Sequence, residues 1–522
     1  MTDRPIAAVT ARELLWVVAA LGLAIALLAL LGGGVLWTRP FWTDEICCTL
    51  YPVLDASSPL EVIARIAAPK DYAPPLLHLI VWSVGRLTGG ITPVVLRSIS
   101  LFCVSAALVF LYATLRRRFD RAPSVAGALA VASHSLVLTN AFEGRFYGPW
   151  LLFAAGFAWS LSRDVTASTS ASNVLRMTIT ALCSVFLVTI HWFGVLSLVL
   201  MCFGALASYG RRWREGLRLI APSAAGLVAL VACVPMVISQ RATTTGVLWV
   251  AELSTGQVGA MVRLFVLSTV PVLALILLVV DGLRDEISQP SATANVRRAL
   301  RDPSLAALTS LALMPLALIG VSVVLQPSLV GRYATVTALA WAPLVALAVA
   351  TLGRVARAVA VLFLALIVVL GVRRTVAERR DFVNNVEANQ AAFERAKSMN
   401  LPVVFQNLHV IYSVAGLRRA ERRALFLDIP DSTIVAMTPQ KRLERVRRNL
   451  RIDRNIARSH ARVYGFPVMV TQAQLDSTSR FLFVASDESL PNIYGRVDLF
   501  TKTVFPHHRL TRLSPNLALL ER

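Results

Sequence analysis

The sequence is poor in charged residues. Only 16% of its 522 residues are Asp, Glu, Lys or Arg, whereas 56% are hydrophobic. Soluble globular proteins average about 25% charged residues, so this deficit argues against a soluble protein and for a chain whose bulk lies in lipid. Several apolar runs reach the ~20 residues that a helix needs to cross a bilayer, among them 14–37, 304–325 and 334–352.

Lysine is almost absent as well. The chain has only Lys70, Lys397, Lys441 and Lys502, so arginine carries nearly all of the formal net charge of +22. In a soluble protein this charge would suggest nucleic-acid binding. Here the arginines cluster in short loops between apolar runs, as the positive-inside rule expects. We therefore expect membrane lipids around the chain and no nucleic-acid partner.

The six cysteines do not form a disulfide framework. Four of them lie inside apolar runs, where cysteine behaves as a small hydrophobic residue. Cys47 and Cys48 are adjacent, so a bridge between them would be strained. Cysteine and histidine show no spacing that is typical of a metal site, so the pattern excludes a disulfide scaffold and a zinc module.

The positions of the arginines give a topology. Arg4 and Arg12 precede the first apolar run, 14–37, which is too long for a signal-peptide core and is expected to be a retained helix that starts in the cytoplasm. The short run 74–87 is expected to lie at the membrane interface. If it crossed, the arginines at 116–118 would fall outside.

The fold class that follows is an α-helical polytopic membrane protein with about eleven transmembrane helices and a small C-terminal α/β domain. After the first span, the others are expected near 94–115, 124–140, 146–161, 175–191, 192–209, 217–239, 258–280, 305–325, 333–352 and 355–371.

Hydropathy drops after Gly371, and four short β-like runs follow. They are 402–405, 424–427, 467–471 and 481–485. We expect a transmembrane core at 1–372, with its first outer loop at 38–93, and an extracytoplasmic α/β domain at 373–522. An odd number of spans places this domain outside, although the arginines at 373–380 oppose that placement.

Unusual polar residues share the outer face in this topology. They are Asp44, Glu45, Lys70, Asp71, His78, Glu143, Arg145, His191, Gln240, Arg241, Arg332 and Tyr333. Each alone also fits a structural role, such as a solvated loop, a snorkelling arginine or a core histidine. Ionisable groups at membrane depth are costly and mark function, so their shared side predicts a site.

Five short motifs within this set follow one another along the chain. They are Trp42-Thr43-Asp44-Glu45, Ala73-Pro74-Pro75-Leu76-Leu77-His78, Glu143-Gly144-Arg145-Phe146-Tyr147, Thr189-Ile190-His191-Trp192-Phe193-Gly194 and Gly331-Arg332-Tyr333. In this order they resemble the motifs of the GT-C superfamily, the multi-spanning glycosyltransferases that use polyprenyl-phosphate sugars. The branch that is most similar includes protein O-mannosyltransferases, the aminoarabinose transferases of lipid A and lipopolysaccharide-sugar transferases. Ala73, Ile190 and Trp192 depart from the family pattern, which bears on the identity of sugar and acceptor.

The resemblance implies a glycosyltransferase of the cell inner (plasma) membrane, with its active site facing the periplasm or outside. It would move a sugar from a polyprenyl-phosphate donor to a hydroxyl or amine of a cell-envelope glycan, lipid or protein acceptor. The site residues that it implies are Asp44 and Glu45 for catalysis, Lys70, Arg145, Arg332 and Tyr333 for the donor phosphate, and His78, Glu143, Tyr147 and His191 for substrate. Asp44 is the expected base, and arginine suits phosphate because it offers two N–H groups.

No cofactor is implied with certainty. A divalent metal ion stays open, because some GT-C members use one and others do not, and Glu143 is a second acid or a metal ligand in this interpretation. Two other functions also stay open. One is a ligase that moves a whole lipid-linked glycan, and the other is a transporter or flippase. A transporter would favour charges near mid-membrane and repeated halves, which this sequence lacks. In a non-catalytic scaffold Asp44 would be dispensable.

Overall fold

The structure is a computed structural model, and it describes two compact units of the chain. The described residues are 39–41, 43–67, 73–161, 170–244, 255–259, 261–262, 301–325, 328–350, 352, 354–405, 411–412, 424–428, 457–458, 461, 467–484, 504–514 and 517–522. The helical unit comprises Met1–Thr38, Ala73–Pro235 and Val250–Ala377, and the α/β unit comprises Arg39–Tyr72, Met236–Trp249 and Glu378–Arg522.

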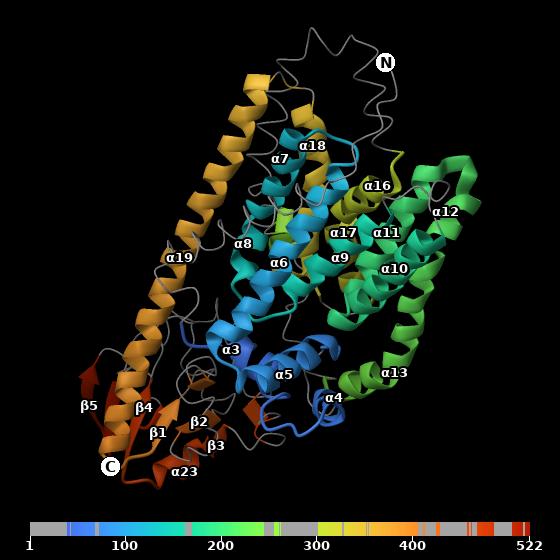
Figure 1. Cartoon of the computed structure of the whole chain (residues 1–522). Helices are drawn as coiled ribbons and strands as arrows, with labels where there is room; N and C mark the ends of the chain where they lie inside the picture. Colours follow the sequence, from blue (N-terminus) through green and yellow to red (C-terminus); the bar gives the residue numbers. More distant parts are fainter. Residues whose placement is uncertain are drawn as a thin grey trace. The chain divides into compact units, whose positions relative to one another are not determined.

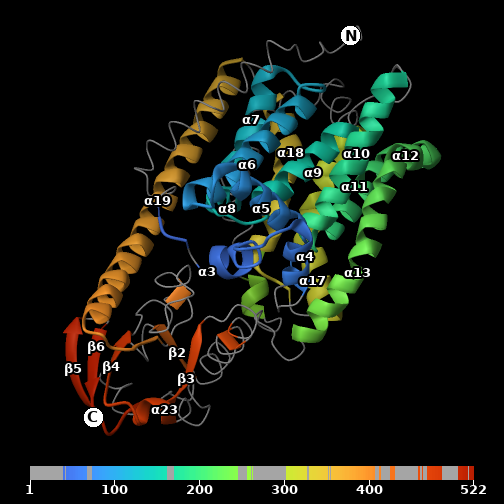
Figure 2. The same cartoon turned by 60° about the horizontal axis from the view of Figure 1, so that its bottom comes forward.

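The helical unit is a bundle whose helices lie side by side in both views (Figure 1, Figure 2). Its α-helices are α5 (Leu76–Thr88), α6 (Pro93–Leu115), α7 (Arg121–Ala132), α8 (Ser135–Ala141), α9 (Tyr147–Leu161), α10 (Ser170–Ile190), α11 (Gly194–Tyr209), α12 (Trp213–Ile220), α16 (Pro303–Ser310), α17 (Met314–Val324) and α18 (Trp341–Ala350). Short 3-10 turns join them, and one long 3-10 helix, η5 (Gly331–Ala340), precedes α18. Helices α13 (Ala224–Thr244) and α19 (Arg354–Ser398) begin in this unit and end in the α/β unit.

The protein is a multi-pass membrane protein. Among the described residues, six helices are long and apolar enough to cross a bilayer, or seven if α7 and α8 count as one broken span. Large apolar side chains stand exposed on these helices, such as Val228 at 70% and Leu362 at 69% exposure. Exposed apolar surface of this extent fits contact with lipid. The predicted span 14–37 and most of 258–280 lie outside the described residues.

Several predicted spans differ from single regular α-helices. The runs 217–239 and 305–325 contain the 3-10 turns η3 (Ala221–Ser223) and η4 (Leu311–Leu313), and two other runs depart further. The run 124–140 forms α7 and α8, which meet at a bend of 67°. His134 lies in this bend, and its Nδ1 accepts a hydrogen bond from the Leu136 N–H at 3.3 Å, which caps α8. The run 333–352 begins as η5 and becomes α-helical only at Trp341.

The run 74–87 forms one short helix. Helix α5 has 13 residues, which gives a length of about 20 Å and is too short for a bilayer core of about 30 Å. Its length therefore agrees with the prediction that it does not cross. Its place at the membrane interface stays a prediction.

The helices of the bundle approach closely where one of them carries glycine. Helix α6 packs along α9, and α7 packs along α18. At the second crossing, a Cβ at Gly127 would lie 2.6 Å from the carbonyl oxygen of Ala342. Small residues allow such backbone approach, which is how helices associate in membranes.

The α/β unit contains a six-stranded sheet. Its strands are β1 (Val403–Phe405), β2 (Ala424–Asp428), β3 (Val468–Thr471), β4 (Arg480–Val484), β5 (Arg509–Ser514) and β6 (Leu517–Glu521). The order is β3-β2-β1-β4-β6-β5. Strands β1 to β4 are parallel, while β6 pairs antiparallel with β4 and β5. The four predicted runs are confirmed as β1 to β4. The hairpin β5–β6 was not predicted, although Pro515-Asn516 between its strands is a turn signal.

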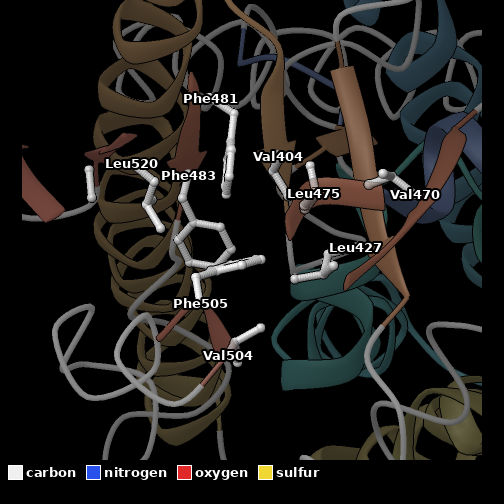
Figure 3. Packing of buried hydrophobic residues seen from close by; sticks show 10 residues of the cluster. Val404, Leu427, Val470, Leu475, Phe481, Phe483, Val504, Phe505 and Leu520 are labelled. Atoms are coloured by element: carbon white, nitrogen blue, oxygen red, sulfur yellow. The ribbon is translucent and has the colours of Figure 1, made fainter. Parts of the chain in front are cut away.

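Aromatic rings fill the core of this sheet. Phe481, Phe483 and Phe505 pack together with Val404 and Leu520 (Figure 3). The rings of Phe481 and Phe505 are in edge contact, with centroids 5.1 Å apart. A short helix, α23 (Gln472–Asp476), follows β3 and begins with a capping box from Thr471 and Gln474.

The close approach of α7 and α18 at Gly127 can be tested by mutation. Gly127→Ala should lower the thermal unfolding temperature of the detergent-solubilised protein, because overpacking against a backbone atom costs about 1–3 kcal/mol. Gly320→Ala on α17 is the matched control, since no neighbouring segment among the described residues comes within 4 Å of its added methyl group. That change should leave the unfolding temperature unchanged or raise it, because alanine is the better helix former. Equal unfolding temperatures for the two variants would contradict the close crossing.

Candidate active site

The turn between α8 and α9 carries Glu143 and Arg145. The Glu143 N–H donates to the Asn140 carbonyl at 3.2 Å, and the Arg145 N–H donates to the Glu143 carbonyl at 2.8 Å. A Cβ at Gly144 would collide with the Leu96 side chain on α6. Both charged residues are buried, with 5% and 8% exposure. The tight turn therefore holds two opposite charges inside the helical unit.

A second turn, between α10 and α11, carries His191. Its Nδ1 accepts a hydrogen bond from the Phe193 N–H at 3.2 Å, so the proton of the neutral ring lies on Nε2. A Cβ at Gly194 would collide with the carbonyl oxygen of Leu187. The glycine of this motif is therefore needed for the turn that presents the histidine.

Four aromatic rings surround His191. It stacks on Trp150 at 21° with centroids 4.7 Å apart, and the centroids of Phe146, Phe193 and Tyr333 lie 4.0, 5.3 and 5.2 Å from its own. The Trp150 indole N–H donates to Ser197 Oγ at 3.2 Å. This aromatic cage contains residues from three of the predicted motifs, and it adds Trp150, which lies outside those motifs.

Two guanidinium groups belong to the same cluster. The Arg145 guanidinium lies over the Phe146 ring, 5.1 Å from its centroid. Burial holds the pKa of His191 well below its usual range, and the nearby charges of Arg145 and Arg332 lower it further. The histidine is therefore neutral. Arg145 and Arg332 thus place two guanidinium charges beside this histidine, and Glu143 is the acidic residue of the cluster.

Arg332 and Tyr333 open the 3-10 helix η5. Arg332 is partly exposed and Tyr333 is buried. Thr335 Oγ1 donates to the Arg332 carbonyl at 2.5 Å and accepts from Asn140 Nδ2 at 2.9 Å. The start of η5 is thereby joined to helix α8.

Tyr147 has a hydroxyl group without a hydrogen-bond partner among the described residues. Its side chain is fully buried, and it interacts electrostatically with Arg332, Arg145, Tyr333 and Glu143. A buried hydroxyl without a partner costs about 1–3 kcal/mol. A group that is kept at this cost beside two guanidiniums is a strong candidate for ligand binding.

The acidic pair lies in the α/β unit. Asp44 and Glu45 lie in α3 (Thr43–Glu45), which continues as a π-helix, η1 (Ile46–Leu50). Glu45 is fully buried and its Oε1 lies 3.9 Å from Nη2 of the buried Arg39, whereas Asp44 is partly exposed. Arg39 is not among the site residues predicted from the sequence. Asp44 is therefore the more accessible carboxylate of the pair, in a π-helical context that is frequent at functional sites.

The structure divides the predicted site residues into three groups. It brings Glu143, Arg145, Tyr147, His191, Arg332 and Tyr333 together in the helical unit. His78 lies on α5 in the same unit and is buried. Asp44 and Glu45 lie in the α/β unit, while Lys70 and Asp71 lie outside the described residues.

Gln240 and Arg97 are two further polar residues that are buried. Gln240 Nε2 donates to the Ile66 carbonyl at 3.2 Å, at the end of helix α4 (Pro59–Ala67), so it anchors a helix terminus. Arg97 on α6 is fully buried and was not predicted as a site residue. An ionisable residue inside the apolar run 94–115 was the signal that could have found it.

The described residues contain no group of three or more His, Cys, Asp or Glu side chains arranged to hold a metal ion. The cluster in the helical unit consists mainly of hydrogen-bond donors and cations. Its chemistry suits an anionic ligand.

Comparison with known proteins gives a match at the level of the fold. No family model and no curated protein sequence matches the chain. The solved structure of ArnT from Cupriavidus metallidurans bound to undecaprenyl phosphate is similar, with a TM-score of 0.59 and 12% identity over 96% of this chain and 98% of that one.

A second match is weaker. The archaeal oligosaccharyltransferase AglB from Archaeoglobus fulgidus, in complex with an inhibitory peptide and a dolichol-phosphate, aligns with a TM-score of 0.42 and 11% identity over 90% of this chain and 69% of that one. That score is too low to carry an argument. The alignment with ArnT covers nearly the whole of both chains, and it agrees with the five motifs. The chain therefore has the fold of the GT-C superfamily of glycosyltransferases.

Proposed function

We propose that this protein is a membrane glycosyltransferase that moves a sugar from a polyprenyl-phosphate-linked donor to a hydroxyl or amine of a cell-envelope glycan, lipid or protein. The observation that carries the proposal is the buried Tyr147 hydroxyl, which lacks a partner among the described residues and lies beside Arg145 and Arg332. The solved structure with the same fold, ArnT, is bound to undecaprenyl phosphate.

The cluster has the properties of a phosphate site. Arg145 and Arg332 supply N–H donors in the planar arrangement that matches phosphate oxygens. Tyr147 supplies one O–H donor, and the two neighbouring guanidinium charges favour an anion. Because His191 is neutral, it adds a donor at Nε2 without a further charge. Tyr333 and Lys70 complete the set that we assign to the donor phosphate.

The reaction needs one base. In the proposed step, an acceptor hydroxyl or amine attacks the anomeric carbon of the sugar, and a new glycosidic bond forms. The bond between that carbon and the phosphate oxygen breaks, so polyprenyl phosphate leaves with an additional negative charge. The arginines stabilise this charge. We assign the acceptor proton to Asp44, because Glu45 is buried against Arg39.

The substrate-binding roles follow the same assignment. His78 and Glu143 contribute to the sugar and acceptor side in this proposal, whereas His191 donates from Nε2 to the donor phosphate. The site faces the periplasm or outside of a cell inner membrane, and the domain at 373–522 lies on that side. A chain that binds polyprenyl phosphate but transfers no sugar would instead be a carrier or flippase.

Tyr147→Phe tests the phosphate site. Donor binding should weaken by about 10-fold or more, because one hydrogen bond to a charged ligand is lost. Stability should not fall, because the hydroxyl has no partner among the described residues. Binding of polyprenyl phosphate to the purified protein and its thermal unfolding temperature are the two measurements. Unchanged binding, or a clear loss of stability, would place the hydroxyl in a structural role.

Asp44→Asn tests the base. The change keeps the shape but removes the basic oxygen, so turnover should fall by about two to four orders of magnitude while donor binding survives. The assay measures release of polyprenyl phosphate from polyprenyl-phosphate sugars by the purified protein. Glu61→Gln, in α4 of the same unit, is the matched control and should leave turnover unchanged. Near-normal turnover of the Asp44 variant would pass the role to Glu45 or Glu143.

A further inference from the structure

The 3-10 helix η5 needs stabilising contacts with other segments of the protein. It runs for ten residues, Gly331–Ala340, whereas 3-10 runs of more than about four residues are uncommon because their hydrogen bonds are poorly aligned. Its first residues are Arg332 and Tyr333. A helix that is weak by itself therefore holds one of the two arginines of the phosphate site.

A chain of buried hydrogen bonds provides this support. Asn140 Nδ2 donates to Thr335 Oγ1 at 2.9 Å, and Thr335 Oγ1 donates its own proton to the Arg332 carbonyl at 2.5 Å. Ser100 Oγ on α6 donates to the Asn140 carbonyl at 3.4 Å. Asn140 is 4% exposed and Thr335 is fully buried. Water cannot easily replace bonds at this depth.

The same asparagine also supports the other arginine. Its carbonyl accepts the Glu143 N–H at 3.2 Å, and the Glu143 carbonyl accepts the Arg145 N–H at 2.8 Å. The backbone of Asn140 thus shapes the turn that carries Arg145, and its side chain holds the start of η5. One residue joins the two segments that carry the guanidiniums.

We propose that Asn140 is a positioning residue, and that its hydrogen bond to Thr335 sets the spacing of Arg145 and Arg332 so that both engage one phosphate. This inference rests on the proposed function. It adds a residue that touches no substrate and lies outside the five sequence motifs. Losing the bond should let η5 shift, so that Arg332 no longer binds the phosphate that Arg145 holds.

Thr335→Val and Thr335→Ser form a matched pair. Valine keeps the shape but removes the hydroxyl, whereas serine keeps the hydroxyl. Binding of polyprenyl phosphate should weaken by about 10-fold in the valine variant and stay within about twofold of wild type in the serine variant. Asn140→Asp is the second variant. A carboxylate cannot donate to Thr335, so its binding should weaken as well. Equal binding by the valine and serine variants would overturn the proposal.

A double-mutant cycle separates positioning from general damage. If Thr335 acts through Arg332, then Thr335→Val should cause no further loss in an Arg332→Ala background, because coupled residues are not additive. An equal loss in both backgrounds would mean that the hydroxyl supports the structure generally, and the positioning role would be wrong.

Hydrogen exchange gives a readout that does not depend on the ligand. Amides of 331–340 should exchange faster in Thr335→Val than in Thr335→Ser, because only valine removes the bond that holds η5. If wild type binds no polyprenyl phosphate, the proposed function fails, and this comparison still decides whether Asn140 and Thr335 hold η5. Equal exchange in the two variants would refute the inference.

Discussion

Backbone that leaves the α-helix inside a membrane protein has to find its hydrogen-bond partners within the protein, because lipid offers none. This constraint shapes the helical unit. The break between α7 and α8 is capped by the His134 ring. The long 3-10 helix η5 is joined to α8 through Asn140 and Thr335. At the first break the histidine ring supplies a partner for the Leu136 N–H, and at η5 the buried side chains of Asn140 and Thr335 hold the start of the helix.

The same interruptions create the site. Glu143 and Arg145 follow the end of α8, His191 lies in the turn after α10, and Arg332 and Tyr333 begin η5. Such residues would be costly at positions that face lipid. Turns inside the bundle instead direct them inward, where an aromatic cage surrounds His191. The packing that makes the bundle also gathers the charges.

A neutral histidine lies beside two charged arginines in this cluster. The pKa of His191 stays low because it is buried beside Arg145 and Arg332. A third positive charge there would be strongly unfavourable without a ligand. The two guanidinium charges therefore stand beside a neutral histidine, and an incoming phosphate can compensate them. This arrangement joins the structural role of the histidine to the electrostatics that we propose for donor binding.

The fold survives at 12% identity to ArnT, and the constraints above offer a reason. Lipid-facing positions need only be apolar, so they can change freely among hydrophobic residues. The turns have stricter needs, such as a glycine at 194 where a Cβ would meet the Leu187 carbonyl.

The sequence by itself determined the membrane class, the short helix α5, the positions of strands β1 to β4 and six of the residues that cluster in the helical unit. Those inferences rest on hydropathy, on strand-like runs and on motifs, all of which are local in the chain. Tertiary structure alone decided the break between α7 and α8, the 3-10 character of η5, the pairing of Glu45 with Arg39 and the bond between Asn140 and Thr335. The last two side chains are 195 residues apart. Local sequence carries no signal for such a pair, because a buried asparagine and a buried threonine read as ordinary helix residues until the fold brings them together.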